Sequence, residues 1–401
     1  MKRRLVILIT HPIQYYVPLY RELAERQNID VHVVFLSDAG AEAYHDEKFG
    51  RTFAWDIPML QGYQYTVLRP GFNISENHFI SMHSKSLLRV LHAIKPNAIM
   101  LYGYASRMNW VALNWAVKNS VRVLYGSDSN AKIPRVLWKL PVKHVVVSDF
   151  FEKVDVFLCS SEVNNQYLLK YGASVNKIVR FPFSIDYDRF SRGAAVLGKK
   201  RLYNFAWAGK FVPEKRPQDF VAAFKRIASS TSFDVRASMI GDGEQFDMIS
   251  NMLDSLQLNE KIELKGFINQ MAMPKALQES EALVFTSEFE PYGLIATEAA
   301  AAGLALVVAD GIGCVGDTVL ARPGVNALIY PPGDVDALAD AMLQLLVNDK
   351  LRLDMQQASR SIAAEHDIPV AAAIMESVVN KVCARGGGEI MTARVDVAPE
   401  A

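Results

Sequence analysis

The side chains best placed for chemistry in this 401-residue sequence lie in one loop and helix of its second half. The apolar residues 282–285 predict a buried strand, and an alanine-rich helix is expected to begin near Gly293. Free backbone N–H groups at such a helix start suit a diphosphate. Glu290 precedes the helix, and Glu298 lies roughly 7 Å beyond Gly293 at about 1.5 Å per residue.

This separation is about what a nucleotide sugar needs between its sugar and its ribose. A carboxylate accepts hydrogen bonds from paired hydroxyl groups, so acidic residues at both ends of the helix start make chemical sense. The alternative is that Glu290 is a loop charge and Glu298 a solvated helix residue. We predict that the donor is bound by Glu290, Tyr292, Gly293, Leu294, Ile295 and Glu298.

A second set of charged residues lies in the loop that follows the predicted strand 204–208. Gly209 and Lys210 begin this loop, and Lys215 stands near its end. Anions bind at the carboxyl ends of strands in parallel sheets, so two ammonium groups there could neutralise a diphosphate leaving group without a metal ion. The alternative is a pair of solvated surface lysines.

Two glycine turns follow later strands of the same half. Gly241 ends one strand, and Gly266 precedes Phe267 and Ile268 after the next. Each turn is weak evidence alone. Both are expected on the same side of the sheet as Lys210, so we predict that Gly241, Phe267 and Ile268 border the base and ribose of the donor.

The elements that must position these residues follow a βαβ pattern. Short apolar runs alternate with helical patterns along the chain, which is typical of parallel sheets. The pattern breaks near residues 181–186, and a second series begins at residue 204. The sequence therefore predicts an α/β fold of two tandem Rossmann-like, doubly wound domains that face a central cleft. The predicted strands are residues 5–9, 31–36, 98–102, 121–125, 156–159, 204–208, 235–240, 262–264, 282–285 and 306–309.

The expected domain boundaries divide the chain into four segments. An N-terminal Rossmann-like domain covers residues 1–184 and is expected to hold the acceptor. A C-terminal one covers residues 185–365 and is expected to bind the nucleotide-sugar donor. A helix at residues 366–385 is expected to return to the N-terminal domain, and residues 386–401 read as a disordered tail.

Composition excludes several classes of protein. The 43 basic and 43 acidic residues give zero net charge, which argues against nucleic acid as the main partner. The three cysteines, Cys159, Cys314 and Cys383, are far apart and odd in number, so we expect neither a disulfide framework nor a zinc site. No stretch of about 18 apolar residues predicts a membrane span. The apolar run 5–9 is too short for a signal peptide, so a soluble cytoplasmic protein is expected.

Together these segments resemble glycosyltransferase family 4, a family of retaining enzymes with the GT-B fold. The resemblance covers nearly the whole chain and rests on Glu290 and Glu298, which are followed by an alanine-rich stretch, a glycine and a hydrophobic strand. It implies that Glu290 contacts the donor sugar and Glu298 the ribose. The family's diphosphate clamp resembles Gly209-Lys210 with Lys215, although Lys210 stands where the family usually has arginine.

The first domain departs from the family pattern in two places. Its first βα loop has no double glycine and contains His11, which could contact the acceptor or the donor sugar. The alternative is a loop histidine bonded to backbone. The family's histidine after the strand 121–125 is also absent. Asp128 stands nearest that position and is a candidate catalytic carboxylate.

The resemblance implies a retaining transfer that needs no metal and no cofactor beyond the nucleoside-diphosphate sugar as co-substrate. Lys210, Lys215 and the helix start would stabilise the departing diphosphate. The acceptor would be a glycan, a lipid-linked molecule or a small molecule. Two alternatives remain open: a sugar-nucleotide epimerase or phosphorylase on the same fold, and an inert partner subunit that binds a nucleotide sugar.

Residues 132–144 form a basic, aromatic and apolar strip. Such a strip could rest on an anionic membrane that presents a lipid-linked acceptor, which would make the protein peripheral at the inner face of the membrane. The alternative is a core helix whose lysines extend to solvent.

Overall fold

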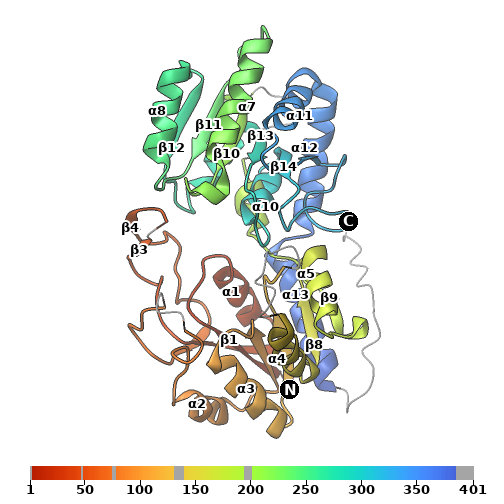
Figure 1. Cartoon of the computed structure of the whole chain (residues 1–401). Helices are drawn as coiled ribbons and strands as arrows, with labels where there is room; N and C mark the ends of the chain where they lie inside the picture. The colour runs from red at the N-terminus through yellow and green to blue at the C-terminus, as the bar shows by residue number, and fades with distance from the viewer. Residues whose placement is uncertain (1, 47, 75–77, 131–139, 194–200, 385–401) are drawn as a thin grey trace. The chain divides into compact units, whose positions relative to one another are not determined.

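The computed structural model describes residues 2–46, 48–74, 78–130, 140–193 and 201–384 (Figure 1). These residues form two compact units. Unit 1 is built from the described residues of Met1–Glu42, Pro58–Ser184 and Ile368–Ala401, and unit 2 from those of Ala43–Ile57 and Ile185–Asp367. The sequence predicted an unbroken first domain over 1–184, whereas Ala43–Ile57 groups with unit 2. The expected tail 386–401 and the first part of the strip, residues 132–139, lie outside the described residues.

Unit 1 contains a parallel sheet whose order is β5-β2-β1-β6-β7-β8-β9. The chain adds β2 and β5 on one side of β1 and then crosses to the other side to add β6 through β9. The strand order therefore reverses between β1 and β6. The strands are β1 (Arg3–Ile9), β2 (Ile29–Phe35), β5 (Gln64–Val67), β6 (Ala98–Tyr102), β7 (Arg122–Gly126), β8 (Val156–Cys159) and β9 (Ile178–Arg180).

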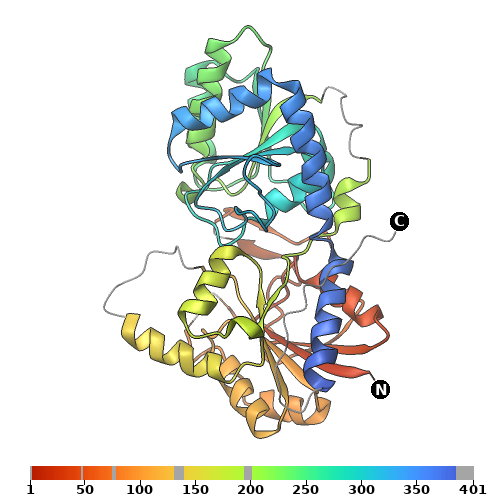
Figure 2. The same cartoon turned by 90° about the vertical axis from the view of Figure 1, so that its right-hand side faces the viewer.

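Helices cover the sheet of unit 1 on both faces (Figure 2). Right-handed crossovers place α1 and α3 on opposite faces, because the chain moves across the sheet in opposite directions at these two helices. α1 packs against α13, which also contacts β1 and β2, and α3 packs against α2, β6 and β7. The helices are α1 (Val17–Glu25), α2 (Leu87–Ile94), α3 (Arg107–Lys118), α4 (Leu140–Glu152), α5 (Glu162–Lys170) and α13 (Ile368–Ala384).

Unit 2 repeats this plan with the strand order β12-β11-β10-β13-β14-β15, again parallel throughout. Its order reverses between β10 and β13. Residues of β13 and β14 are buried along their whole length, as expected for strands covered on both faces. The strands are β10 (Tyr203–Ala208), β11 (Ala237–Ile240), β12 (Ile262–Gly266), β13 (Ser280–Phe285), β14 (Ala305–Ala309) and β15 (Ala327–Tyr330).

The helices of unit 2 pack around α7 and α10, and α11 and α12 connect the two sets. α7 packs against α8 and α11, whereas α10 packs against α6, α9 and α12. These helices are α6 (Tyr187–Ser191), α7 (Pro217–Ser230), α8 (Phe246–Leu256), α9 (Met273–Gln278), α10 (Leu294–Ala301), α11 (Val335–Val347) and α12 (Asp349–Ala364).

Unit 2 also contains a small antiparallel hairpin of β3 (Tyr44–Asp46) and β4 (Arg51–Phe53). In the chain it lies between β2 and β5 of unit 1. The predicted fold class, α/β with two Rossmann-like parallel sheets, is confirmed. Among the described residues, no helix is both long and apolar enough to cross a bilayer.

Candidate active site

The candidate site lies in unit 2, where the loops that follow β10 and β13 meet. These strands flank the point at which the strand order reverses, and ligands of doubly wound sheets bind outside the carboxyl ends of the strands at such a point. A cavity of about 510 Å³ opens there. Ligand pockets typically measure about 300–1,000 Å³, so it is large enough for a small molecule. Its lining residues are Lys48, Lys210, Val212, Glu214, Lys215, Glu288, Phe289 and Glu290.

Hydrogen bonds between the two loops fix the position of Lys215. The lysine ends a short 3₁₀ turn, Pro213–Lys215, just before α7. The Thr286 hydroxyl, which follows β13, donates to the Lys215 carbonyl at 2.6 Å and accepts from the Trp207 indole N–H at 2.8 Å. The buried Trp207 of β10 therefore contacts the end of β13 through Thr286, and Thr286 in turn holds the lysine loop that follows β10.

The Lys215 ammonium forms an ion pair with the Glu290 carboxylate. Burial lowers the pKa of Lys215 to about 8; Lys48 and Lys210 act in the same direction, and Glu214 opposes them. Two predicted catalytic residues, 75 positions apart in the chain, are thus in contact. An anionic ligand would favour the charged lysine, which the cavity disfavours.

Lys210 is the second predicted cation, and its ammonium group already has partners in the hairpin. Its Nζ donates to both carboxylate oxygens of Asp46, at 2.9 and 2.8 Å, and lies 4.4 Å from the centre of the Phe49 ring. Asp46 and Phe49 belong to the hairpin. Lys210 lines the cavity, and its partners Asp46 and Phe49 lie in a segment for which the sequence predicted no role.

Glycines bring the predicted turns of this edge close together. The Gly209 N–H donates to the Ile240 carbonyl at 3.0 Å, and the Gly241 N–H donates to the Gly266 carbonyl at 2.8 Å. Gly241 has a φ of +138°, and a Cβ there would overlap the Gly209 carbonyl. Only glycine allows this approach of the two backbones.

α10 begins at Leu294, with Gly293 as its N-cap in the left-handed conformation. A Cβ at Gly293 would lie 2.5 Å from the Phe285 ring, so the helix start packs tightly on the end of β13. A glycine cap brings no side chain to the first N–H groups of the helix. Leu294 and Ile295 begin the helix and are half-buried. Their N–H groups are suited to an anionic ligand.

Glu298 lies in the middle of α10 and is only 3% exposed. Burial raises its pKa to about 7, and the Arg189 guanidinium acts in the opposite direction. A buried carboxylate of this kind is not the solvated helix residue that the sequence left open as an alternative. Glu298 is not among the lining residues of the 510 Å³ cavity.

Two predicted donor contacts have other neighbours. Tyr292 is 3% exposed, and its hydroxyl lies 3.2 Å from the His366 Nδ1, so its side chain belongs to the core. Phe267 is half-buried beneath the Phe49 and Phe53 rings, with centres 5.2 and 4.6 Å away. Its neighbour Ile268 is also half-buried.

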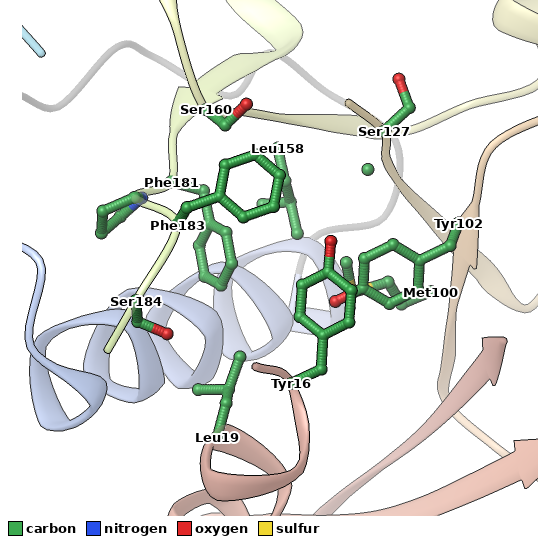
Figure 3. Close-up of a pocket in the computed structure, with 12 residues that line it drawn as sticks. Tyr16, Leu19, Met100, Tyr102, Ser127, Leu158, Ser160, Phe181, Phe183 and Ser184 are labelled. Atoms are coloured by element: carbon green, nitrogen blue, oxygen red, sulfur yellow. The ribbon is translucent and has the colours of Figure 1, made fainter. Parts of the chain in front are cut away.

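The corresponding edge of unit 1, at the reversal between β1 and β6, is lined by aromatic side chains (Figure 3). The Tyr16 ring lies 4.8 Å from Tyr102 and 6.2 Å from Phe183, measured between ring centres. Burial raises the pKa of the Tyr16 phenol well above its usual value. The cavity measures about 30 Å³, room for little more than one water molecule.

His11 and Asp128 both lie in unit 1. Burial lowers the pKa of His11 to about 4, and its Nδ1 lies 2.9 Å from the Thr10 hydroxyl. Asp128 is exposed. Burial is the main cause of the raised pKa values of Tyr16 and Tyr125, and the Asp128 charge acts in the same direction. Within the described part of the chain, no hydrogen bond or ion pair joins His11 to Asp128. Their catalytic roles stay predictions.

The described part of the strip begins α4. Val142 is 68% exposed, whereas Lys143 Nζ lies 5.3 to 5.7 Å from the ring centres of Tyr104, Tyr167 and Tyr171. The strip therefore combines an exposed apolar residue with a lysine that covers aromatic surface. The described residues contain no group of three or more side chains arranged to hold a metal ion.

Comparison with known proteins places this geometry in context. Residues 195–362, which include most of unit 2, match the family described as glycosyl transferases group 1. N-acetyl-alpha-D-glucosaminyl L-malate synthase from Bacillus anthracis is 29% identical over 156 residues, 38% of each chain. A 2-deoxystreptamine N-acetyl-D-glucosaminyltransferase from Niallia circulans is 25% identical over 174 residues, 43% of each chain. The chain thus spans less than half the length of these relatives.

Solved structures extend the similarity to the whole fold. HepE from Anabaena, in complex with UDP, superposes with a TM-score of 0.68 over 95% of this chain and 100% of that protein, at 14% identity. A glycosyltransferase from Rickettsia africae gives a TM-score of 0.72 over 96% and 100%, also at 14% identity. At such identity the likeness establishes the fold, which is that of the GT-B glycosyltransferases.

Proposed function

We propose that this protein is a retaining glycosyltransferase of family 4 that moves a sugar from a nucleoside-diphosphate sugar to an acceptor hydroxyl group. One observation carries the proposal: Lys210, Lys215 and Glu290 line a single cavity at the strand-order reversal of unit 2. That cavity lies within the chain segment that matches the group 1 glycosyltransferases, except for Lys48. The UDP complex of HepE supports a nucleotide-sugar donor by analogy.

The diphosphate of the donor binds between Lys210, Lys215 and the start of α10. Glu290 binds hydroxyl groups of the sugar and Glu298 those of the ribose, while Phe267, Ile268 and Gly241 border the base. During transfer the bond between the anomeric carbon and the diphosphate oxygen breaks. The acceptor oxygen bonds to the same face of that carbon, and its proton passes to the departing diphosphate. The two lysines stabilise the charge that develops on the leaving group.

The reaction needs no metal ion in this proposal, because lysine ammonium groups and helix N–H groups supply the positive field at the diphosphate. Full activity in EDTA is the expected result. Loss of activity with chelator that magnesium or manganese restores would reject this part of the proposal.

Unit 1 provides the acceptor site, and the acceptor is a glycan, a lipid-linked molecule or a small molecule. The exposed Val142 and the basic strip support contact with an anionic membrane at its cytoplasmic face. Vesicles with anionic lipid should then co-sediment the protein at low salt and release it at high salt. Absence of vesicle binding at low salt would mean that residues 132–144 have only a structural role.

The decisive experiment is a thermal-shift panel of nucleoside diphosphates and nucleotide sugars, because a ligand that binds only the folded state raises Tm. The panel identifies the base and the sugar. The best donor is then incubated with and without acceptors, and the products are analysed. Transfer with retained anomeric configuration supports the proposal. Isomerised donor without acceptor indicates an epimerase, dependence on phosphate a phosphorylase, and binding without turnover an inert partner subunit.

A further inference from the structure

The hairpin Ala43–Ile57 is anchored on unit 2, although the strands on either side of it in the chain belong to unit 1. At its end, the Asn269 amide donates to the Ala54 carbonyl at 2.8 Å. The Asp56 carboxylate accepts from the Met271 N–H at 3.1 to 3.2 Å. Both acceptors lie in the segment that follows β4, so the base of the hairpin is fixed to the loop after β12.

Aromatic contacts continue from this anchor to Phe267. Phe53 is tilted against the Phe267 ring, Phe49 meets it edge to face, and the Arg51 guanidinium lies 4.8 Å from its centre. Arg51 also reaches the Asp242 carboxylate at 3.4 Å. The hairpin therefore covers the residue that is proposed to border the donor base.

At its tip the hairpin reaches the lysine cavity. Asp46 holds the Lys210 ammonium with both of its oxygens, and Lys48 pairs with the Glu214 carboxylate. Lys48 itself lines the cavity. The hairpin therefore contributes the Lys48 ammonium to the cavity lining. It also contributes the Asp46 carboxylate, which binds the Lys210 ammonium.

Charge complementarity indicates how these groups would respond to a diphosphate. The Asp46 side chain is 16% exposed, so its charge is poorly screened beside Lys210. A diphosphate that approaches Lys210 meets the Asp46 carboxylate as a like charge, and the two anions compete for the same ammonium. Lys48, 62% exposed and paired with Glu214, is free to change partners at little cost.

We propose that the hairpin Ala43–Ile57 is part of the diphosphate site, in which Lys48 is a third phosphate-binding cation and Asp46 is an internal anion that the diphosphate displaces from Lys210. The inference rests on the proposed function, since it assumes that the cavity binds a diphosphate. It assigns one phosphate-binding residue and one competing anion to a segment more than 150 residues away from Lys210 in the chain.

Calorimetric titration with inorganic pyrophosphate and with UDP tests the inference, because pyrophosphate probes the cations without a base or sugar. Lys48→Met should weaken binding of both by about 10-fold, the loss of one charge-assisted contact. Lys48→Arg keeps the charge and should retain most of the affinity. Asp46→Asn should tighten binding about three- to tenfold, because the competing charge is removed.

Two controls separate the hairpin's charges from its fold. Asp56→Asn alters a carboxylate at the hairpin base, away from the cavity, and should leave both affinities within about twofold. In a Lys210→Met background, Asp46→Asn should no longer tighten binding, since the carboxylate acts through that ammonium. Thermal unfolding of each variant checks that it folds.

The outcomes are distinguishable. If neither pyrophosphate nor UDP binds the wild-type protein, both the inference and the proposed diphosphate site are wrong. If both bind and Lys215→Met weakens them, but Lys48→Met has no effect or Asp46→Asn weakens binding, the proposed function stands and the hairpin inference is overturned. If Asp46→Asn still increases the affinity for pyrophosphate in the Lys210→Met background, the proposed displacement of Asp46 from Lys210 is also overturned.

Discussion

The two parallel sheets reverse their strand order at corresponding places, yet the side chains gathered there differ in chemistry. In unit 2 the reversal between β10 and β13 opens a cavity of about 510 Å³ lined by three lysines and three glutamates. In unit 1 a cavity of about 30 Å³ beside the reversal between β1 and β6 is lined by aromatic and small side chains. One topology therefore supports two kinds of surface.

The difference follows from what each first loop contributes. After β10, Lys210 and Lys215 bring positive charge to the sheet edge. After β1, His11 has a pKa of about 4 and is uncharged at neutral pH, and the buried Tyr16 phenol keeps its proton. A positively charged first loop suits a diphosphate, and an uncharged first loop beside aromatic rings suits a neutral ligand such as a sugar.

Removing the lysine charge at unit 2 should have the largest effect. We expect Lys215→Met to lower kcat/KM by about 100- to 1,000-fold, because the departing diphosphate loses a buried cation. Nucleoside-diphosphate affinity, measured by calorimetry, should fall as well. Lys275→Met, at an exposed position of α9, is the matched control and should be silent. Unchanged diphosphate affinity in the folded Lys215 variant would contradict the assignment.

Glu290→Gln should mainly lower kcat, by about 10- to 100-fold, because the amide keeps the shape but weakens charge-assisted bonds to the reacting sugar. Free nucleoside diphosphate carries no sugar, so its inhibition constant should change little. The same variant removes the anionic partner of Lys215, and an Asp substitution checks whether that ion pair alone explains the loss. A pure KM effect would argue against a contact with the sugar.

Glu298→Gln should mainly raise the donor KM, by about 10-fold, because the ribose does not react and its contact is equal in the ground and transition states. Free nucleoside diphosphate should lose a similar factor in affinity. Steady-state kinetics and inhibition constants measure both values. Wild-type kinetics in both glutamate variants would leave the pair without a role in the donor site.

The pKa of Glu298 adds a pH test. Because the folded pKa of about 7 exceeds the ordinary glutamate pKa of 4.5, the folded state binds more protons, and stability falls as pH rises from 4.5 through 7. The upper bound of this cost is about 3 kcal/mol. Glu298→Gln should therefore have a higher Tm than the wild-type protein above pH 7 and the same Tm below pH 4.5. Glu260→Gln, at an exposed site, should show no such pH-dependent difference in Tm. An identical Tm difference at all pH values would exclude the titration.

Sequence reasoning located the central strands and the charged loops for a physical reason. Strands such as β1, β10 and β14 are covered on both faces, so they read as uninterrupted apolar runs. Loops at their carboxyl ends then follow by position, which brought Lys210, Lys215 and Glu290 into the prediction. The donor-site contacts of these residues stay predictions.

The edge strands of unit 1 and the role of the hairpin could not be predicted, for other physical reasons. β5 and β9 are edge strands without fully buried residues, and they carry no apolar run that a sequence pattern can detect. The hairpin's Asp46 and Lys48 act on residues far away in the chain, and no periodicity links the two segments. The one available signal was the density of aromatic residues at Phe49, Phe53 and Trp55 among charges, which is unusual for a plain connection.

The smallest expected effect tests whether the loop after β1 in unit 1 is uncharged. The folded pKa of His11, about 4, lies below the ordinary value of 6.5, so the folded state binds fewer protons than the unfolded chain. Stability should therefore be lost as pH falls from 6.5 towards 4. The ring is only partly buried, so we expect about 1–2 kcal/mol rather than the full value of the shift. Thermal unfolding across this range measures it.

His11→Gln should flatten this acid limb, because a glutamine does not titrate, and His78→Gln, at an exposed position, should leave it unchanged. Activity of the His11 variant relative to wild type should be constant between pH 6 and 8, since the native ring is neutral throughout that range. An activity ratio that changes through pH 6.5 would mean that His11 carries a charge there. The two reversals would then both be charged, and the aromatic edge of unit 1 would be suited to an anionic ligand instead.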